Sequence, residues 1–290
     1  MPDLAYVNGR VTPVEDAVVS IDDRGFVFGD AVYEALRVYG GKPFALDRHQ
    51  KRLQRSLAEL RIGGADVAAI EAAILDLIDR SALRDAIVYW QVTRGAQVRD
   101  HAPAPDLKPT VVITVRAFKK SALLDYERGS KVIAVKDIRW GRVDIKSTNL
   151  LPNVLARWQA KEAGCYEAIL VAGDIVREAC ATAVGIAREG ALVLPKQGPW
   201  ILPSITREIT EELCERAKIP VMIRDFSLDE LLSADEVLLM GSSTEIAGIV
   251  EVNGTPAGGG RVGPMTRKLL SLYRDSIAES LGISRSEIGD

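Results

Sequence analysis

The chain has 290 residues, of which 47% are hydrophobic and 27% are charged; this composition is typical of a folded globular protein and excludes a disordered or fibrous one. Its 37 basic and 40 acidic residues leave a net charge of −3, so nucleic-acid binding is not expected. Three cysteines without C-x-x-C spacing and only two histidines argue against a disulfide framework and a metal site. Because the chain shows no leader-like start and no apolar run of membrane length, we expect a cytoplasmic protein.

Residues 1–118 are predicted to fold as a small α+β domain. Asn8-Gly9 lies between two short apolar stretches, which is the pattern of a tight hairpin because both turn residues need a positive φ. Further strands are predicted over 32–39, 87–92 and 111–115, and helices over the segment that Asp47 would cap and over 67–83.

The polar, aperiodic residues 119–130 predict an interdomain linker, and residues 131–290 a larger α+β domain. Its predicted strands are 132–135, 167–171, 183–187 and 237–240, with a hairpin over 251–256 and helices over 151–163, 205–217 and 265–281. Ser204 is expected to cap the helix over 205–217, and Ser227 to form a capping box with Glu230. Because strands and helices do not alternate regularly, we predict α+β lobes rather than a doubly wound sheet.

Several side chains have a chemistry that the local sequence leaves open. Lys146 lies between an apolar stretch and a helix start; desolvation there would favour the neutral amine that forms a Schiff base, although an exposed lysine is the commoner outcome. Arg52 lies on a helix where an exposed arginine is the default. Glu178 can either pair with Arg177 or face a site as a carboxylate.

Other candidates are equally open when each is considered alone. Ile205 and Thr206 stand at a helix start, where free N–H groups favour an anion, although most helix starts bind only water. Arg99 and His101 lie in a polar loop that is solvated by default. Tyr33, on a predicted strand, can line a site or belong to the core.

Together these residues form an ordered series that resembles the class IV aminotransferases, the pyridoxal-phosphate (PLP) enzymes of fold type IV. The series comprises Asp23 to Asp30 with Val32-Tyr33-Glu34, His49 to Leu53, Thr93-Arg94-Gly95 with Arg99-Asp100-His101, Asp137 to Trp140, Lys146 to Leu151, Gly164 to Ala168, Ile205-Thr206-Arg207 and Ser243 to Ile246. It extends over nearly the whole chain. The resemblance implies an α+β fold of two lobes with the cofactor between them.

The resemblance also implies which residues serve the cofactor. Lys146 matches the lysine that holds PLP as a Schiff base and then moves the substrate proton. Glu178 matches the carboxylate that faces the pyridine nitrogen and keeps it protonated. The positions that match the remaining cofactor contacts are Arg52, Ile205, Thr206 and Ser242 for the phosphate and Leu202 for the ring.

Within the family, the resemblance is greatest to the members that act on D-amino acids. Tyr33, Arg99 and His101 match their three ligands of the substrate α-carboxylate, and because the Arg-x-His loop there comes from the neighbouring subunit, a homodimer is implied. We therefore expect a transaminase that moves the amino group of a D-amino acid such as D-alanine to 2-oxoglutarate or pyruvate by ping-pong chemistry. No nucleic acid or membrane partner is expected.

One stretch departs from the family pattern. After the glutamate the family shows glycine, hydroxyl residues and asparagine, whereas this chain has Ala179-Cys180-Ala181-Thr182-Ala183, so weaker cofactor contacts are expected there. Two alternatives remain open. A branched-chain or (R)-amine transaminase, or an aminodeoxychorismate lyase, would keep the cofactor and change the substrate. A non-catalytic small-molecule binding protein on the same scaffold would account for the altered stretch.

Overall fold

The computed structural model describes residues 3–288, which divide into two units. The first unit contains residues 3–119, Ile145–Asn149 and 281–288, and the second contains Lys120–Asp144 and Leu150–Ser280. Two segments distant in the sequence thus group with the first unit, a feature that composition did not predict. The predicted boundaries at 118, 119–130 and 131 stay a prediction.

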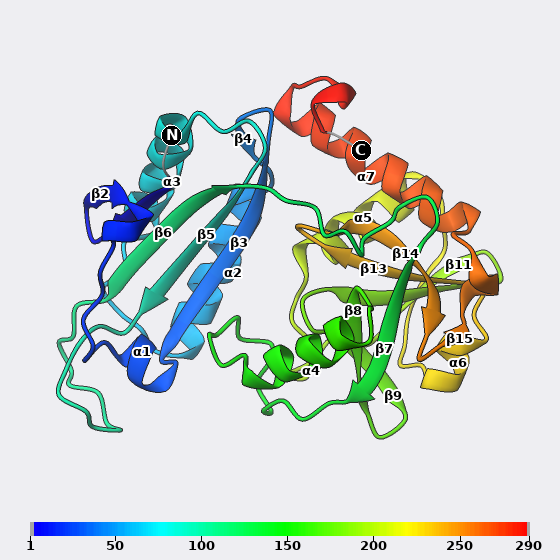
Figure 1. The fold of residues 1–290 in the computed structure, drawn as a ribbon, viewed down its shortest axis with the longest axis horizontal. Coiled ribbons are helices and arrows are strands. Elements are labelled where there is room, and N and C mark those ends of the chain that lie inside the picture. Colours follow the sequence, from blue (N-terminus) through cyan, green and yellow to red (C-terminus); the bar gives the residue numbers. More distant parts are fainter. Residues whose placement is uncertain (1–2, 289–290) are drawn as a thin grey trace. The chain divides into compact units, whose positions relative to one another are not determined.

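The first unit is built on an antiparallel sheet with the strand order β2-β1-β6-β5-β3-β4 (Figure 1). Its strands are β1 (Leu4–Val7), β2 (Arg10–Pro13), β3 (Ala31–Tyr39), β4 (Lys42–Pro43), β5 (Ala86–Thr93) and β6 (Thr110–Ala117). The predicted hairpin is confirmed: Asn8 and Gly9 join β1 to β2 with φ values of 46° and 93°. The three other predicted strands are also confirmed.

Helices α2 (Leu46–Glu59) and α3 (Val67–Ser81) pack on one face of this sheet, and a short helix, α1 (Arg24–Phe28), precedes β3 (Figure 1). The core between helices and sheet contains Leu36, Leu53, Ile74, Leu77 and Trp90, all fully buried. Alternation along β3 and β5 leaves the opposite face to Tyr33, Tyr89 and Gln91, which are half-buried.

The predicted cap of α2 is wrong. The helix begins at Leu46, and its N-cap is Ala45, which has a left-handed φ of 55° and makes no side-chain capping bond. Asp47 lies inside the first turn instead, where its negative charge interacts favourably with the positive end of the helix dipole.

The second unit is built on a mixed sheet with the order β12-β11-β10-β13-β14-β7-β8-β9, and β15 pairs with β14. Its strands are β7 (Ser130–Lys136), β8 (Glu167–Ala172), β9 (Ile175–Ala179), β10 (Ala183–Arg188), β11 (Ala191–Leu194), β12 (Val221–Ile223), β13 (Glu236–Gly241), β14 (Glu245–Val252) and β15 (Thr255–Pro256). Its helices are α4 (Leu151–Glu162), α5 (Ile205–Arg216), α6 (Leu228–Leu232) and α7 (Pro264–Leu281).

Both faces of this second sheet are covered. Along β8, Ala168 and Leu170 pack against α4, whereas Ile169 and Val171 belong to the main core on the other face. This explains why β8 is a continuous apolar run rather than an alternating one. Short 3₁₀ turns complete the described chain at Val14–Asp16, Gly258–Gly260 and Arg285–Glu287. The predicted α+β architecture is confirmed.

The two predicted caps in this unit differ in outcome. Ser204 caps α5 by accepting a hydrogen bond from the Arg207 N–H at 3.2 Å, as predicted. Ser227 caps α6 by accepting from the Glu230 N–H, but the Glu230 carboxylate binds Arg224 at 3.0 Å rather than closing a capping box. Over the described residues, no helix is both long and apolar enough to cross a membrane.

Candidate active site

Lys146 lies on a short segment that runs beside β3 in the first unit. The Tyr33 N–H donates to the Lys146 carbonyl at 3.0 Å, and Val32 forms a bridge with Ser147. On the helix side, the Lys146 N–H donates to the Ser56 Oγ of α2 at 3.3 Å, and Ser56 is fully buried. The backbone of Lys146 is thus fixed by both a strand and a helix.

The Lys146 side chain is half-buried and packs on an aromatic ring. Its Nζ lies 4.2 Å from the centroid of the Tyr33 ring. Within residues 3–288 the amine makes no hydrogen bond or ion pair, so the ring is its main neighbour. Lys146 is therefore neither fully exposed nor fully buried, and its role as the cofactor lysine stays a prediction.

Arg52 belongs to a buried polar group that β3 and α2 form together. Its Nε and Nη2 each donate to the Glu34 carboxylate at 2.7 Å, and its side chain is only 9% exposed, so the default of an exposed arginine is wrong. Burial alone would raise the pKa of Glu34, but Arg52 and His49 outweigh it and lower that pKa to about 2. Glu34 therefore stays ionised and orients the guanidinium of Arg52.

His49 is the third member of this group. Burial lowers its pKa despite the contact with Glu34, so the imidazole is neutral near pH 7. Because the ionised carboxylate only accepts, the His49 Nδ1 must carry the proton that it donates to Glu34 at 2.7 Å. Sequence reasoning gave Glu34 and His49 no role, although their signal was present: His49 and Arg52 are one turn apart on α2.

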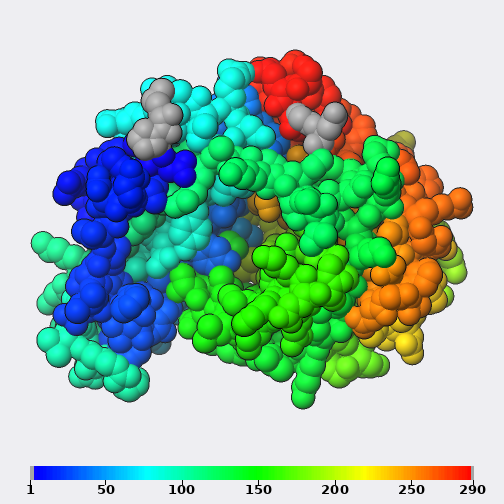
Figure 2. All heavy atoms as spheres, in the orientation of Figure 1, coloured from blue at the N-terminus to red at the C-terminus, as the bar shows by residue number. Residues whose placement is uncertain are grey.

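Arg99 and His101 lie in the exposed segment between β5 and β6. Figure 2 shows this segment, in teal, at the surface beside the blue residues of α1. Both side chains contact one ring: the Arg99 guanidinium lies 5.1 Å and the His101 ring 5.3 Å from the centroid of Phe28. No hydrogen bond, ion pair or ring contact joins this pair to Tyr33 and Lys146 in the described chain.

Glu178 lies in the second unit, at the end of β9, and is 5% exposed. The predicted alternative of a salt bridge with Arg177 is wrong, because the partner is Arg139, whose guanidinium contacts the carboxylate directly. The Leu202 N–H adds hydrogen bonds of 3.2 and 3.3 Å to its two oxygens. Arg139 belongs to the segment Asp137 to Trp140 that resembles the family, but the sequence predicted no role for it.

Glu178 and Asp137 share one hydrogen-bonded arginine. The Arg139 guanidinium contacts Glu178 and binds Asp137 at 3.0 and 2.8 Å. Burial raises the pKa of Glu178, and Asp137 adds to that effect while Arg139 opposes it. A cationic ring nitrogen placed against Glu178 would favour its ionised form.

The start of α5 provides the second unit's other polar feature. Ser204 satisfies the Arg207 N–H, whereas the N–H groups of Ile205 and Thr206 precede any intrahelical partner. Leu202 lies just before this helix and is half-buried. Such a start favours an anion through its free donors and its dipole.

The turn between β13 and β14 places Ser242 next to a residue that the sequence did not single out. Ser242 is half-buried and follows Gly241, where an added Cβ would lie only 2.9 Å from the Thr182 methyl group. Thr182 is 5% exposed, and its buried hydroxyl has no hydrogen-bond partner in the described structure. The altered stretch 179–183 therefore still contains a hydroxyl group without a partner, next to Gly241.

Comparisons with known proteins agree on one family. The model for "Amino-transferase class IV" matches residues 31–252. The D-alanine aminotransferase of Staphylococcus haemolyticus is 35% identical over 266 residues, covering 91% of this chain and 94% of that protein. Among solved structures, the 4-amino-4-deoxychorismate lyase of Pseudomonas aeruginosa is 29% identical with a TM-score of 0.81, covering 94% of this chain and 99% of the other.

A branched-chain amino acid aminotransferase from a T.th. strain, solved with pyridoxamine 5'-phosphate, has a TM-score of 0.86 at 23% identity and covers 96% of this chain and 95% of that one. Each unit contains groups that suit PLP: the first has a primary amine without a polar partner, and the second has a buried carboxylate, a buried hydroxyl without a partner at Thr182 and free N–H groups at the start of α5. The chain belongs to the class IV aminotransferases, PLP-dependent transaminases with the α+β fold of fold type IV.

Proposed function

We propose that this transaminase moves the amino group of a D-amino acid, such as D-alanine, to a 2-oxo acid such as pyruvate or 2-oxoglutarate, by ping-pong chemistry. The observation that carries the substrate class is the pair Arg99 and His101, held on one loop around Phe28. The D-alanine aminotransferases that are 35% identical over 91% of the chain support the same choice.

PLP, when bound, supplies the electron sink that allows the Cα–H bond of an amino acid to break and its nitrogen to be transferred. We assign its covalent attachment to the Nζ of Lys146. We assign its phosphate to Arg52, to the N–H groups of Ile205 and Thr206 and to Ser242, and one face of its ring to Leu202. These assignments are supported by the unpaired amine and by the free donors at the start of α5.

In this proposal two residues move or hold protons. Lys146 takes the proton from the substrate Cα, because its amine lacks a competing polar partner and its backbone is fixed on both sides. Glu178 holds the proton on the ring nitrogen, because a buried carboxylate favours a cation beside it. Arg139 keeps Glu178 oriented through their direct contact.

Substrate selection falls to Tyr33, Arg99 and His101, which we assign to the α-carboxylate. A carboxylate anchored on one side determines which enantiomer presents its Cα hydrogen to Lys146, so selectivity follows from orientation. We further propose a homodimer in which the loop of Arg99 and His101 serves the neighbouring subunit. The cytoplasmic location is likewise part of this proposal, supported by cysteines that are all free.

An amino-donor screen tests the proposal. The PLP-loaded enzyme is offered D- and L-alanine, D- and L-leucine and (R)-1-phenylethylamine with 2-oxoglutarate, and each oxo product is measured. We expect D-alanine to be the preferred donor. A preference for L-leucine or for the amine, or release of pyruvate from 4-amino-4-deoxychorismate, would contradict the proposed substrate while leaving the family intact. Since the chain is an aminotransferase, the non-catalytic alternative is not retained.

A further inference from the structure

Arg24 is a buried arginine that none of the roles above uses. It is 5% exposed and begins α1, directly after Asp23, which is fully buried. The Asp23 carboxylate accepts from the Gly25 N–H at 2.8 Å and from the Thr93 hydroxyl at 3.0 Å, and the Arg24 N–H donates to the Gly95 carbonyl at 2.9 Å. These bonds fix the start of α1 against the end of β5.

Two glycines make this close approach possible. A Cβ on Gly25 would lie 2.4 Å from the Thr93 methyl carbon, so α1 could not approach β5 with any other residue there. Gly95 has a φ of 107°, and a Cβ on it would lie 2.0 Å from the Lys108 carbonyl oxygen. The two glycines therefore permit the close contacts that fix the backbone of Arg24 against the end of β5.

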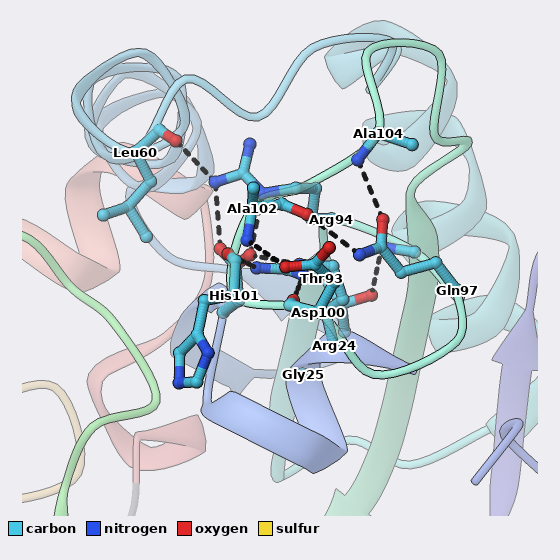
Figure 3. Close-up of polar contacts among 12 residues, drawn as sticks. Arg24, Gly25, Leu60, Thr93, Arg94, Gln97, Asp100, His101, Ala102 and Ala104 are labelled. Atoms are coloured by element: carbon cyan, nitrogen blue, oxygen red, sulfur yellow. Dashed lines mark hydrogen bonds and ion pairs between the residues drawn. The ribbon is translucent and has the colours of Figure 1, made fainter. Parts of the chain in front are cut away.

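The guanidinium of Arg24 points at the loop that carries the proposed carboxylate ligands (Figure 3). Its Nη1 donates to the Asp100 carbonyl at 2.5 Å and its Nη2 to the His101 carbonyl at 3.0 Å, while its Nε binds Asp30 at 2.8 Å. Only the fork of an arginine places donors on two successive carbonyls and a carboxylate at once.

The side chains of the loop meet Arg24 again at Phe28. The Arg24 guanidinium lies 4.9 Å from the Phe28 ring centroid, close to the corresponding distances of 5.1 Å for Arg99 and 5.3 Å for His101. One ring therefore contacts the buried arginine and both exposed side chains of the loop.

The loop is exposed, but hydrogen bonds within it restrain its backbone. Gln97 donates to the Ala102 carbonyl at 3.1 Å and accepts from the Ala104 N–H at 2.8 Å, as Figure 3 shows. With its backbone already held, the loop loses less conformational freedom when its side chains bind a ligand.

Arg94 provides a natural comparison because it shares Asp30 with Arg24. Its Nε and Nη2 bind the Asp30 carboxylate at 2.7 and 2.9 Å, but its remaining hydrogen bonds go to the carbonyls of Leu60 and Arg61, at the end of α2. Although burial opposes ionisation, the two arginines lower the pKa of Asp30. Arg24 and Arg94 are therefore alike in their carboxylate partner, and differ in what else they hold.

We infer that Arg24, together with Phe28, is a positioning residue for substrate recognition: it holds the backbone of residues 100 and 101 so that Arg99 and His101 are preorganised for the donor's α-carboxylate. The inference rests on the proposed function, because it gives those two side chains their ligand. Arg24 itself does not touch the substrate.

The test compares Arg24→Lys with the matched control Arg94→Lys in the PLP-loaded enzyme. Lysine keeps the charge beside Asp30 in both variants, but in Arg24→Lys it cannot reach both loop carbonyls. We expect Arg24→Lys to raise the KM for D-alanine at least about 10-fold with kcat little changed, since a displaced anchor weakens binding of the α-carboxylate in the ground state and the transition state alike. We expect Arg94→Lys to leave that KM close to the wild-type value. Amide exchange should rise over residues 97–104 only in Arg24→Lys.

Two further variants keep the test decisive. Phe28→Leu removes the ring that the loop side chains and the Arg24 guanidinium contact but leaves the hydrogen-bonding groups of Arg24 and Asp30 in place, and it should raise the KM as well. In an Arg99→Ala, His101→Ala background, Arg24→Lys should add little, because both side chains that it positions are gone. An Arg24→Lys effect that multiplies with that of the Arg99→Ala, His101→Ala double variant, or that Arg94→Lys equals, would overturn the inference alone. An Arg99→Ala enzyme with an unchanged KM would overturn the proposed carboxylate role, and the inference with it.

Discussion

Glu34 shows at the scale of one residue how a buried charge can be both costly and useful. It is fully buried, so an unpaired carboxylate there would be strongly unfavourable, yet Arg52 and His49 supply hydrogen bonds of 2.7 Å to both oxygens. Glu34 does not contact the cofactor in the proposed site; its carboxylate fixes the guanidinium of Arg52 in one orientation.

We expect Glu34→Gln to lower the free energy of unfolding at pH 7 by about 3 kcal/mol, since its pKa falls from 4.5 to about 2 in the folded state. A lowered pKa stabilises the folded state above the unfolded-state value of 4.5, and this contribution declines as the pH falls toward 2. The difference between wild type and variant should therefore shrink between pH 5 and about pH 3. Urea unfolding over that range measures it.

Asp76→Asn is the matched control for this substitution. Asp76 also pairs with an arginine, Arg80, at 2.9 Å, but its side chain is 48% exposed, so solvent screens the pair. Its loss should change stability much less than the loss of Glu34. A Glu34→Gln protein as stable as Asp76→Asn, or a difference that stays constant with pH, would show that the buried group does not carry the predicted energy.

The ion pair between Glu178 and Arg139 could not be predicted from the local sequence. The family resemblance predicts a role for the Glu178 carboxylate, whereas the local sequence left open either a salt bridge with Arg177 or a carboxylate that faces a site. Alternation along β9 places successive side chains on opposite faces, so Arg177 points away from Glu178 and lies over the Trp200 ring. The partner, Arg139, is 39 residues distant in the sequence, and no local pattern indicates it.

At the scale of elements, most helices and strands could be predicted because their signals are local. The hairpins at Asn8-Gly9 and Asn253-Gly254 depend on two residues with positive φ, and both form. The Ser204 cap depends on one hydroxyl and one N–H three residues on. Such features need no knowledge of the rest of the chain.

Some elements that escaped prediction are created by tertiary contacts, whereas β11 (Ala191–Leu194) was missed although it follows β10 through a tight turn at Glu189-Gly190. α1 has five residues and contains Gly25, a poor helix former, and it is held by Asp23 and by bonds to the end of β5. β12 has three residues and exists through its pairing with β11. The start of α2 shifted because Ala45 adopts a left-handed conformation that no capping rule foresees.

At the scale of the whole molecule, the segment around Lys146 illustrates what sequence cannot reveal. It belongs to the first unit although the residues on either side belong to the second. The reason is the set of contacts with Val32, Tyr33 and Ser56, all at least 90 residues away in the sequence. The resemblance pointed to the lysine; its surroundings required the structure.

The proposed dimer can be tested by complementation between two defective subunits. Arg99→Ala should impair D-alanine binding and Lys146→Ala should abolish turnover. If the loop serves the neighbouring subunit, a mixed dimer has one complete site of two, so purified mixed dimers should show about half of the wild-type activity and a randomly mixed population about a quarter. Coexpressed, differently tagged subunits purified as mixed dimers measure this directly. Activity no greater than that of the two separate variants would contradict the arrangement.

The most direct test of the account concerns the amine of Lys146. The holoenzyme is reduced with borohydride, digested and examined by peptide mass mapping, with Lys146→Ala as the control. We predict a reduced cofactor adduct on the peptide that contains Lys146 and its loss in the variant. An adduct on a different lysine, or none in an enzyme that transaminates, would contradict the central claim.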